Sequence, residues 1–204
     1  RRVGSGGATL HVLNYIAQDL GPAQNGNNLF QNKRVLVIHS GGDSKRVPQY
    51  SVCGKLFSPV PRKLPDGRSS TLFDEFMIGM AGVAGRLRDG MLVLSGDVLL
   101  LFNPLQIDFS FHGAAALSMK EPVSVGKNHG VFLNDGQEFV GRFLHKQTEE
   151  MLHQAGAVND SGLVDLDTGA VALDTDMMQS LYSLICKNGK TDAEAFAQFV
   201  NDKV

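Results

Sequence analysis

A glycine-rich segment with basic residues follows a short apolar run near residue 40. The run spans residues 34–39, and the segment after it reads Ser40-Gly41-Gly42-Asp43-Ser44-Lys45-Arg46-Val47-Pro48. Glycines let backbone N–H groups approach a phosphate without a Cβ in the way. Arg46 can contact two phosphate oxygens at once, and Lys55, which follows Gly54, adds a second positive charge. The pattern predicts a phosphate-binding loop, and a tight turn with exposed bases is the alternative.

A carboxylate ends a second apolar run. Asp97 follows Ser95 and Gly96 at the end of residues 91–95. At a strand end, such a carboxylate can ligate a Mg²⁺ ion that also bridges nucleotide phosphates. The alternative is that Gly96 and Asp97 simply form a turn after the strand. A phosphate loop on a neighbouring strand favours the metal over the turn.

Common phosphate motifs do not fit the chain. Lys55 is followed by Leu56, whereas a P-loop has Ser or Thr there. Gly4-x-Gly6-x-x-Thr9 departs from the dinucleotide fingerprint, and no strand precedes it. Taken alone, Lys146 is typical of a solvated lysine, and His129 is typical of a packed or surface histidine.

The elements that must position these residues alternate between strand-like and helix-like patterns. This alternation predicts an α/β domain with a mixed, mostly parallel sheet. Residues 2–9 are expected to form a glycine-rich loop, with Thr9 capping the first helix. Strands are expected at 34–39, 91–95, 114–119, 130–133, 139–145 and 169–173, and helices at 10–20, 71–87, 148–155, 176–186 and 191–200.

Composition narrows the classes of function. The 204 residues carry a net charge of −2, although residues 31–70 hold eight bases against two acids. This distribution favours a local anionic ligand over a nucleic acid, with a solvated basic loop as the alternative. Cys53 and Cys186 are too far apart to indicate a disulfide framework or a metal cluster. Without a long apolar run or a signal segment, we expect no membrane partner and a cytoplasmic location.

Five ordered motifs resemble a known family. They are Arg2-Val-Gly-Ser-Gly-Gly-Ala-Thr9, His39 to Tyr50 with Cys53-Gly-Lys55, Ser95-Gly-Asp-Val98, Asn128-His-Gly-Val-Phe132 and Leu166-Asp-Thr-Gly169. The chain resembles the pyrophosphorylase domain of the bifunctional L-fucokinase/GDP-L-fucose pyrophosphorylases and of the fucose-1-phosphate guanylyltransferases. The resemblance runs from Arg2 to about the C-terminus.

The resemblance implies a sugar-nucleotidyltransferase fold of the glycosyltransferase-A-like, Rossmann-related type over residues 1–204. It also implies that GTP and L-fucose 1-phosphate form GDP-L-fucose and pyrophosphate, with Mg²⁺, by direct attack of the sugar phosphate. Because the chain opens without Met and no strand precedes Gly4, we expect a piece of a longer polypeptide. In that longer protein, the resemblance implies a kinase domain on the C-terminal side.

Roles for particular residues also come from the resemblance. Arg46, Lys55 and Lys146 would be catalytic. Arg46 would meet the departing pyrophosphate, Lys55 the α-phosphate or the incoming phosphate, and Lys146 the sugar phosphate. Asp97 would ligate Mg²⁺. The nucleotide would contact Gly4, Ser5, Gly6, Gly7, Gly41, Gly42, Asp43, Ser44 and Lys45, and the sugar would contact His129, Gly130, Asp167 and Gly169.

Two other functions remain open from the sequence. A sugar kinase is suggested by the glycine-serine segment at Gly4, although this segment lacks the proline and the serine pair of fucokinase motifs. A nucleotide-binding module without catalysis, inside a larger protein, would also account for the phosphate-loop pattern.

Overall fold

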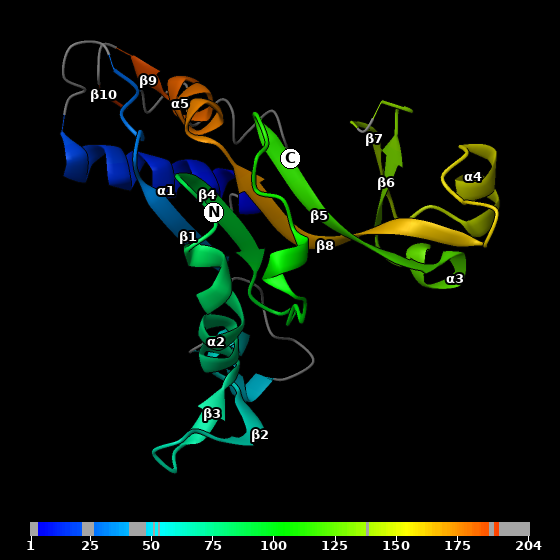
Figure 1. The fold of residues 1–204 in the computed structure, drawn as a ribbon, viewed down its shortest axis with the longest axis horizontal. Coiled ribbons are helices and arrows are strands. Elements are labelled where there is room, and N and C mark those ends of the chain that lie inside the picture. The colour runs from blue at the N-terminus through cyan, green and yellow to red at the C-terminus, as the bar shows by residue number, and fades with distance from the viewer. Residues whose placement is uncertain are drawn as a thin grey trace. The chain divides into compact units, whose positions relative to one another are not determined.

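The computed structural model describes residues 4–21, 27–40, 48–50, 52, 54–137, 139–187 and 190–191. The chain divides into two compact units (Figure 1). The first comprises residues 1–115 and 171–204, and the second comprises residues 116–170. In the described ranges, no helix is long and apolar enough to cross a bilayer.

The first unit is built around a parallel pair of strands. Strand β1 (Arg34–His39) pairs in parallel with β4 (Gly90–Ser95), and α2 (Leu72–Ala84) lies on the crossover between them. Parallel neighbours need a crossover of this kind, because a hairpin can join antiparallel strands only. The end of β8 (Leu163–Leu173) returns antiparallel to β4, with Met91 opposite Leu173.

Two helices cover these strands in Figure 1. Helix α1 (Gly4–Leu20) buries Leu10, Leu13 and Ala17, which recur at helical spacing on one face. They pack in one core with Val37 of β1, Met91 of β4, and Met178 and Tyr182 of α5 (Thr175–Ser183). This core holds the two parallel strands against the helices, and so fixes where their carboxyl ends lie.

Helix α2 begins at a capping box. The Thr71 hydroxyl accepts a hydrogen bond from the Asp74 backbone N–H, and the Asp74 carboxylate accepts one from Thr71 N at 2.8 Å. Two short strands precede the helix, β2 (Pro59–Lys63) and β3 (Ser69–Thr71), and they pair antiparallel. The smaller elements of this unit are the 3-10 turns Pro48–Tyr50, Lys55–Phe57 and Pro104–Gln106, and strands β9 (Cys186–Lys187) and β10 (Lys190–Thr191).

The second unit is an antiparallel sheet with two helices packed on it. Strand β6 (Gly130–Asn134) lies between β8 and β7 (Val140–His145), and β5 (Ala114–Pro122) pairs with β8. Val131, Leu144 and Val164 point into one core with Leu152 of α4 (Glu149–Gln154), and α3 (Val123–Gly126) adds Val123 beside it. One face of this sheet is therefore apolar and covered.

The α/β class and the mixed sheet are confirmed. Parallel pairing, which we expected to predominate, joins β1 to β4, whereas β4–β8, β6–β8 and β6–β7 are antiparallel. The glycine-rich loop expected at residues 2–9 is wrong for residues 4–9, because α1 already begins at Gly4. Thr9 consequently lies within the helix and does not cap it. The helix expected at 191–200 lies almost entirely outside the described residues.

Candidate active site

The carboxyl ends of β1 and β4 lie side by side. His39 is opposite Ser95 in the strand register, and the Gly96 N–H donates to the His39 carbonyl at 2.8 Å. A Cβ on Gly96 would lie 2.6 Å from that carbonyl oxygen, closer than a side chain tolerates. Gly96 therefore allows the turn after β4 to pack against the end of β1. This close approach is what a single site formed by residues after both strands needs.

A second glycine brings Lys55 to the same place. Gly54 has φ 77°, a left-handed conformation that favours glycine, and a Cβ there would lie 3.1 Å from the Ser40 carbonyl oxygen. The Gly54 N–H donates to the Tyr50 carbonyl at 2.9 Å. The chain thus passes the end of β1 immediately before Lys55.

Lys55 and Asp97 meet at these strand ends. The Lys55 ammonium lies 3.3 Å from Asp97 Oδ2, and the Ser95 hydroxyl donates to Asp97 Oδ1 at 2.8 Å. The Ser95 hydrogen bond, followed by that from Lys55, holds the pKa of Asp97 below its ordinary value. Asp97 is therefore an ionised, half-exposed carboxylate beside a cation, and such a pair can hold a metal–phosphate group.

The first turns of α1 reach the end of β1 as well. Thr9 Oγ1 lies 3.0 Å from His39 Nε2 and 3.0 Å from the Ser5 carbonyl oxygen. The Thr9 hydroxyl thus lies within hydrogen-bond distance of both the Ser5 carbonyl and the His39 ring. Burial lowers the pKa of His39, which favours a neutral ring. Gly4, Ser5, Gly6 and Gly7 therefore lie within two helical turns of a residue that contacts β1.

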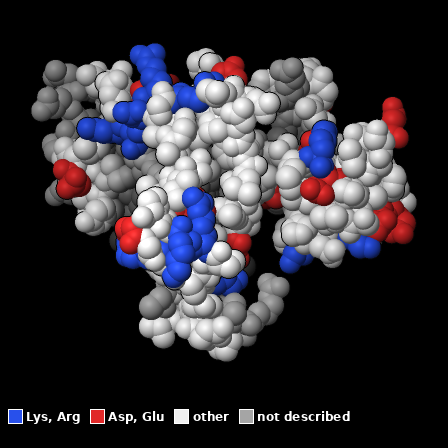
Figure 2. Space-filling model, turned by 60° about the horizontal axis from the view of Figure 1, so that its bottom comes forward, with Lys and Arg blue, Asp and Glu red and all other residues white. Residues whose placement is uncertain are grey.

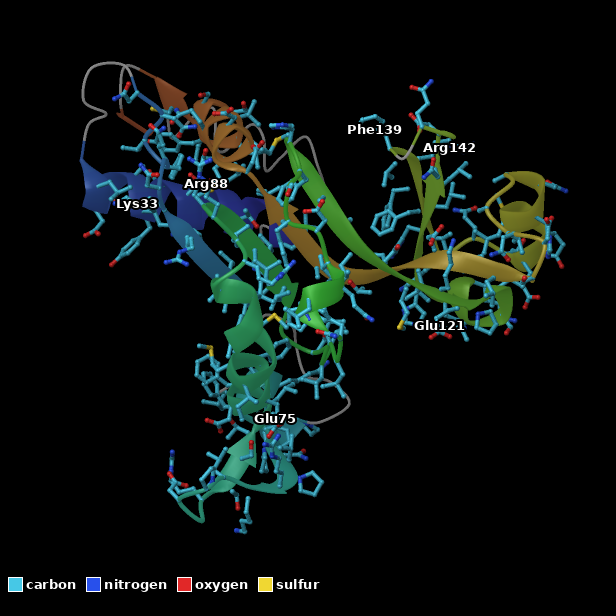
Figure 3. The ribbon with its side chains drawn as sticks, in the orientation of Figure 1. Lys33, Glu75, Arg88, Glu121, Phe139 and Arg142 are labelled. Carbon is cyan, nitrogen blue, oxygen red and sulfur yellow. The ribbon has the colours of Figure 1, made fainter. Side chains whose placement is uncertain are left out.

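The basic stretch of the sequence divides among several places. Of its described bases, Lys55 is at the strand ends, whereas Arg62 pairs with Glu75 at 2.6 Å and Arg68 with Asp66 at 2.6 Å. Figure 3 shows Glu75 on α2 near the β2–β3 hairpin. In Figure 2 the Lys and Arg side chains of the first unit form separate groups with uncharged surface between them. The predicted residues Gly41, Gly42, Asp43, Ser44, Lys45 and Arg46 lie outside the described part of the chain.

The predicted sugar-side residues come together in the second unit. The Lys146 N–H donates to the His129 carbonyl at 2.9 Å, and Lys146 has φ 51°, a positive value that is uncommon outside glycine. The Gly169 N–H donates to Asp167 Oδ1 at 2.8 Å. A Cβ on Gly130 would lie 3.2 Å from the Asp167 Cβ. Three chain segments, at residues 129–130, 146 and 167–169, therefore converge although they are separated in the sequence.

Three residues beside these groups, Ser95, Phe143 and His145, were not predicted from the sequence. Ser95 holds Asp97, and the Phe143 ring lies against Gly130 and stacks on His145, with the ring centroids 6.3 Å apart. The strand alternation of 143, 144 and 145 was an available signal, since Leu144 points to the core and its neighbours point away. Nothing in the sequence itself shows that Phe143 meets Gly130.

Asp97, the predicted metal ligand, lies in the part of the chain that the structure describes. Among residues with described positions, no three His, Cys, Asp or Glu side chains come together as a metal-binding group. Mg²⁺ often takes one or two protein carboxylates and completes its coordination with substrate phosphates and water. A single ionised carboxylate at the strand end fits an ion that is carried largely by a nucleotide.

Comparison with known proteins agrees with these observations. A family model described as the fucose pyrophosphorylase domain matches residues 27–201. The bifunctional fucokinase/GDP-fucose pyrophosphorylase of Arabidopsis thaliana is 30% identical over 214 residues, which cover 91% of this chain and 20% of that protein. The fucose-1-phosphate guanylyltransferase of Mus musculus is 30% identical over 211 residues, 93% of this chain and 34% of that protein.

The fucose-1-phosphate guanylyltransferase of Homo sapiens is 29% identical over 174 residues, 77% of this chain and 26% of that protein. The chain spans about a fifth to a third of the length of these three relatives. The match of residues 27–201 includes most of both compact units and confirms the resemblance on which the residue roles were based. The chain belongs to the fucose pyrophosphorylase family.

Proposed function

We propose that this chain forms the nucleotidyltransferase part of an enzyme that makes GDP-L-fucose and pyrophosphate from GTP and L-fucose 1-phosphate. The family supports this proposal, and so do the names of the relatives, which include fucose-1-phosphate guanylyltransferase. The single observation that carries it is the Lys55–Asp97 pair, 3.3 Å apart at the adjoining ends of β1 and β4. Open α/β sheets bind their ligands beyond the carboxyl ends of such strands.

The proposed reaction is one displacement at phosphorus. A phosphate oxygen of L-fucose 1-phosphate forms a bond to the α-phosphorus of GTP, while the bond from that phosphorus to the bridging oxygen of the β-phosphate breaks. Pyrophosphate leaves with the electron pair of the broken bond. No covalent enzyme intermediate is needed, so the protein accelerates the step by positioning and by neutralising charge.

Lys55 and Asp97 have complementary roles in this proposal. The Lys55 ammonium contacts an oxygen of the α-phosphate and stabilises the negative charge that gathers there. Asp97 would hold Mg²⁺, which when bound neutralises phosphate charge and fixes the phosphate geometry. The Ser95 hydroxyl donates to Asp97 Oδ1, and Oδ2 faces the Lys55 ammonium, so both contacts fix the orientation of the carboxylate.

The remaining roles stay proposals based on the family resemblance. Gly41, Gly42, Asp43, Ser44 and Lys45 would surround the triphosphate, and Arg46 would neutralise the pyrophosphate as it leaves. The first turn of α1, from Gly4 to Gly7, would form another side of the nucleotide site. Lys146 would meet the sugar phosphate, with His129, Gly130, Asp167 and Gly169 around the sugar. A cytoplasmic location and a linked kinase domain belong to the same proposal.

Replacement of Lys55 tests the proposal directly. Lys55→Ala in the native protein should reduce GDP-L-fucose formation by about a hundredfold or more, the effect expected for a lost transition-state charge partner. Lys63→Ala is the matched control, because Lys63 is an exposed base whose ammonium contacts Ser69 in the β2–β3 hairpin. Steady-state rates at saturating GTP measure both. Near-normal turnover in Lys55→Ala would refute the role of Lys55 and remove the central support for this function.

A further inference from the structure

One face of the sheet in the second unit carries aromatic and acidic side chains. Along β7, Leu144 points into the core, so Phe143 and His145 lie on the opposite face. In the β6–β8 register Phe132 lies opposite Asp165, and Asp167 follows two residues later on the same face. Helices α3 and α4 pack on the other, apolar face through Val123 and Leu152.

Phe143 is held in place but remains half exposed. Its ring packs beside Phe132, with centroids 5.4 Å apart, and stacks on His145 with an angle of 24° between the planes. The side chain nevertheless keeps 50% of its surface exposed. A large aromatic ring that is both fixed and exposed provides a preformed apolar surface.

Gly130 lets the Phe143 ring pack directly against the backbone of β6. A Cβ at Gly130 would collide with the edge of the Phe143 ring and would lie 3.2 Å from the Asp167 Cβ. The ring, the glycine backbone and the carboxylate-bearing residue therefore meet at one point. Any side chain at residue 130 would displace the Phe143 ring from its position beside Asp167.

The two carboxylate oxygens of Asp167 differ in their hydrogen bonding. Its Oδ1 accepts the Gly169 N–H at 2.8 Å, which fixes the carboxylate. Within the described parts of the second unit, Oδ2 has no hydrogen-bond partner. An oriented carboxylate oxygen is a strong acceptor for a hydroxyl group.

We propose that Phe143 is a specificity-determining residue whose ring packs against the sugar of L-fucose 1-phosphate, while Asp167 Oδ2 accepts a hydrogen bond from a sugar hydroxyl. This inference rests on the proposed function, and it names the residues that select the sugar. The faces of aromatic rings are negative and attract the weakly positive C–H groups on the apolar face of a sugar. A 6-deoxy sugar adds a methyl group to that apolar surface.

The experiment separates the aromatic ring from simple apolar packing. Phe143→Leu keeps most of the volume but removes the ring, and Phe143→Tyr keeps the ring. Phe139→Leu is the matched control, because Phe139 is also exposed and Figure 3 shows it at the tip of the β6–β7 hairpin. KM for L-fucose 1-phosphate and KM for GTP are measured separately for each variant.

We expect Phe143→Leu to raise KM for L-fucose 1-phosphate by about two- to tenfold, the range expected for a lost aromatic contact. KM for GTP should stay unchanged, Phe143→Tyr should remain close to the wild type, and Phe139→Leu should change neither constant. An unchanged sugar-phosphate KM in Phe143→Leu, or an equal rise in Phe139→Leu, would overturn the inference.

A binding measurement distinguishes failure of this inference from failure of the proposed reaction. L-fucose 1-phosphate is titrated into the wild-type protein while the ring resonances of Phe143 are followed by NMR. Shifts at Phe143 without GDP-L-fucose formation would support the sugar contact and contradict the proposed reaction. Turnover without any shift at Phe143 would support the reaction and contradict the sugar contact.

Discussion

Asp97 is the residue on which the site chemistry concentrates. Its two oxygens have different partners, the Ser95 hydroxyl on Oδ1 and the Lys55 ammonium on Oδ2. The Asp97 side chain is 52% exposed, so the ion pair contributes little to folding stability. The two contacts matter more for the chemistry of the site, because they orient the Asp97 carboxylate and keep it ionised.

Loss of the Ser95 hydroxyl should alter the pH dependence of the reaction. The Ser95 hydrogen bond is the largest cause that lowers the pKa of Asp97, so Ser95→Ala should raise that pKa. A raised pKa means that Asp97 becomes protonated at higher pH as acid is added. The acid limb of kcat/KM against pH should therefore move upward in pH, and Ser95→Thr should restore it. An acid limb at the same pH in Ser95→Ala would contradict this role.

The sequence predicts residues at the site better than their contacts. Lys55 and Asp97 could be identified because each follows a strand or a glycine in the pattern of a phosphate site. The contact of Thr9 with His39 depends on how α1 packs, since the two residues are 30 positions apart. Phe143 has no distinguishing neighbour in the sequence, because the residue its ring packs against, Gly130, lies on another strand.

Close approach of β1 and β4 depends on Gly96 at the level of elements. Gly96→Ala would place a Cβ 2.6 Å from the His39 carbonyl oxygen, so the turn after β4 must shift. We expect a loss of about 1–3 kcal/mol in the free energy of unfolding, as for other overpacked sites, together with lower activity. Chemical denaturation measures the loss.

Gly79→Ala is the control for this prediction. A Cβ at Gly79 would lie 3.7 Å from the Leu100 carbonyl oxygen, an ordinary contact, and Gly79 is within α2. Alanine favours a helix interior by about 0.5–1 kcal/mol over glycine, so this variant should be neutral or more stable. Equal stability of the two variants would show that the β1–β4 ends are not closely packed.

Most elements follow from periodicity, and the exceptions have physical causes. Strands β1, β4 and β6 lie within a residue of their expected bounds because they are short apolar runs. The β2–β3 hairpin was not expected, because the sequence between Pro59 and Ser70 is polar and rich in proline. Helix α1 extends back through three glycines to Gly4, where the helical hydrogen bonds and the packing of Leu10 and Leu13 outweigh poor propensity.

At the scale of the whole molecule, two strands, β5 and β8, each run from one compact unit into the other. The end of β8 pairs with β4 in the first unit, and its earlier residues pair with β6 in the second. Neither pairing can be predicted from the sequence, because the paired residues are far apart in the chain. Met91 and Leu173, for example, are separated by about 80 positions. Assignment of residues 1–204 to a single nucleotidyltransferase domain stays a prediction.

The central claim is that a metal–nucleotide complex binds where β1 and β4 end. Paramagnetic broadening of backbone amide signals by Mn²⁺ and GTP measures this directly, because the ion broadens nearby resonances. We expect the strongest broadening at Gly54, Lys55, Gly96 and Asp97. A cavity of about 650 Å³, lined by Arg86, Arg88 and Asp108 among others, lies near the start of β4, at the opposite end of the strand from Asp97. Amide signals around this cavity serve as an internal comparison. Broadening there, with sharp signals at Lys55 and Asp97, would contradict the claim.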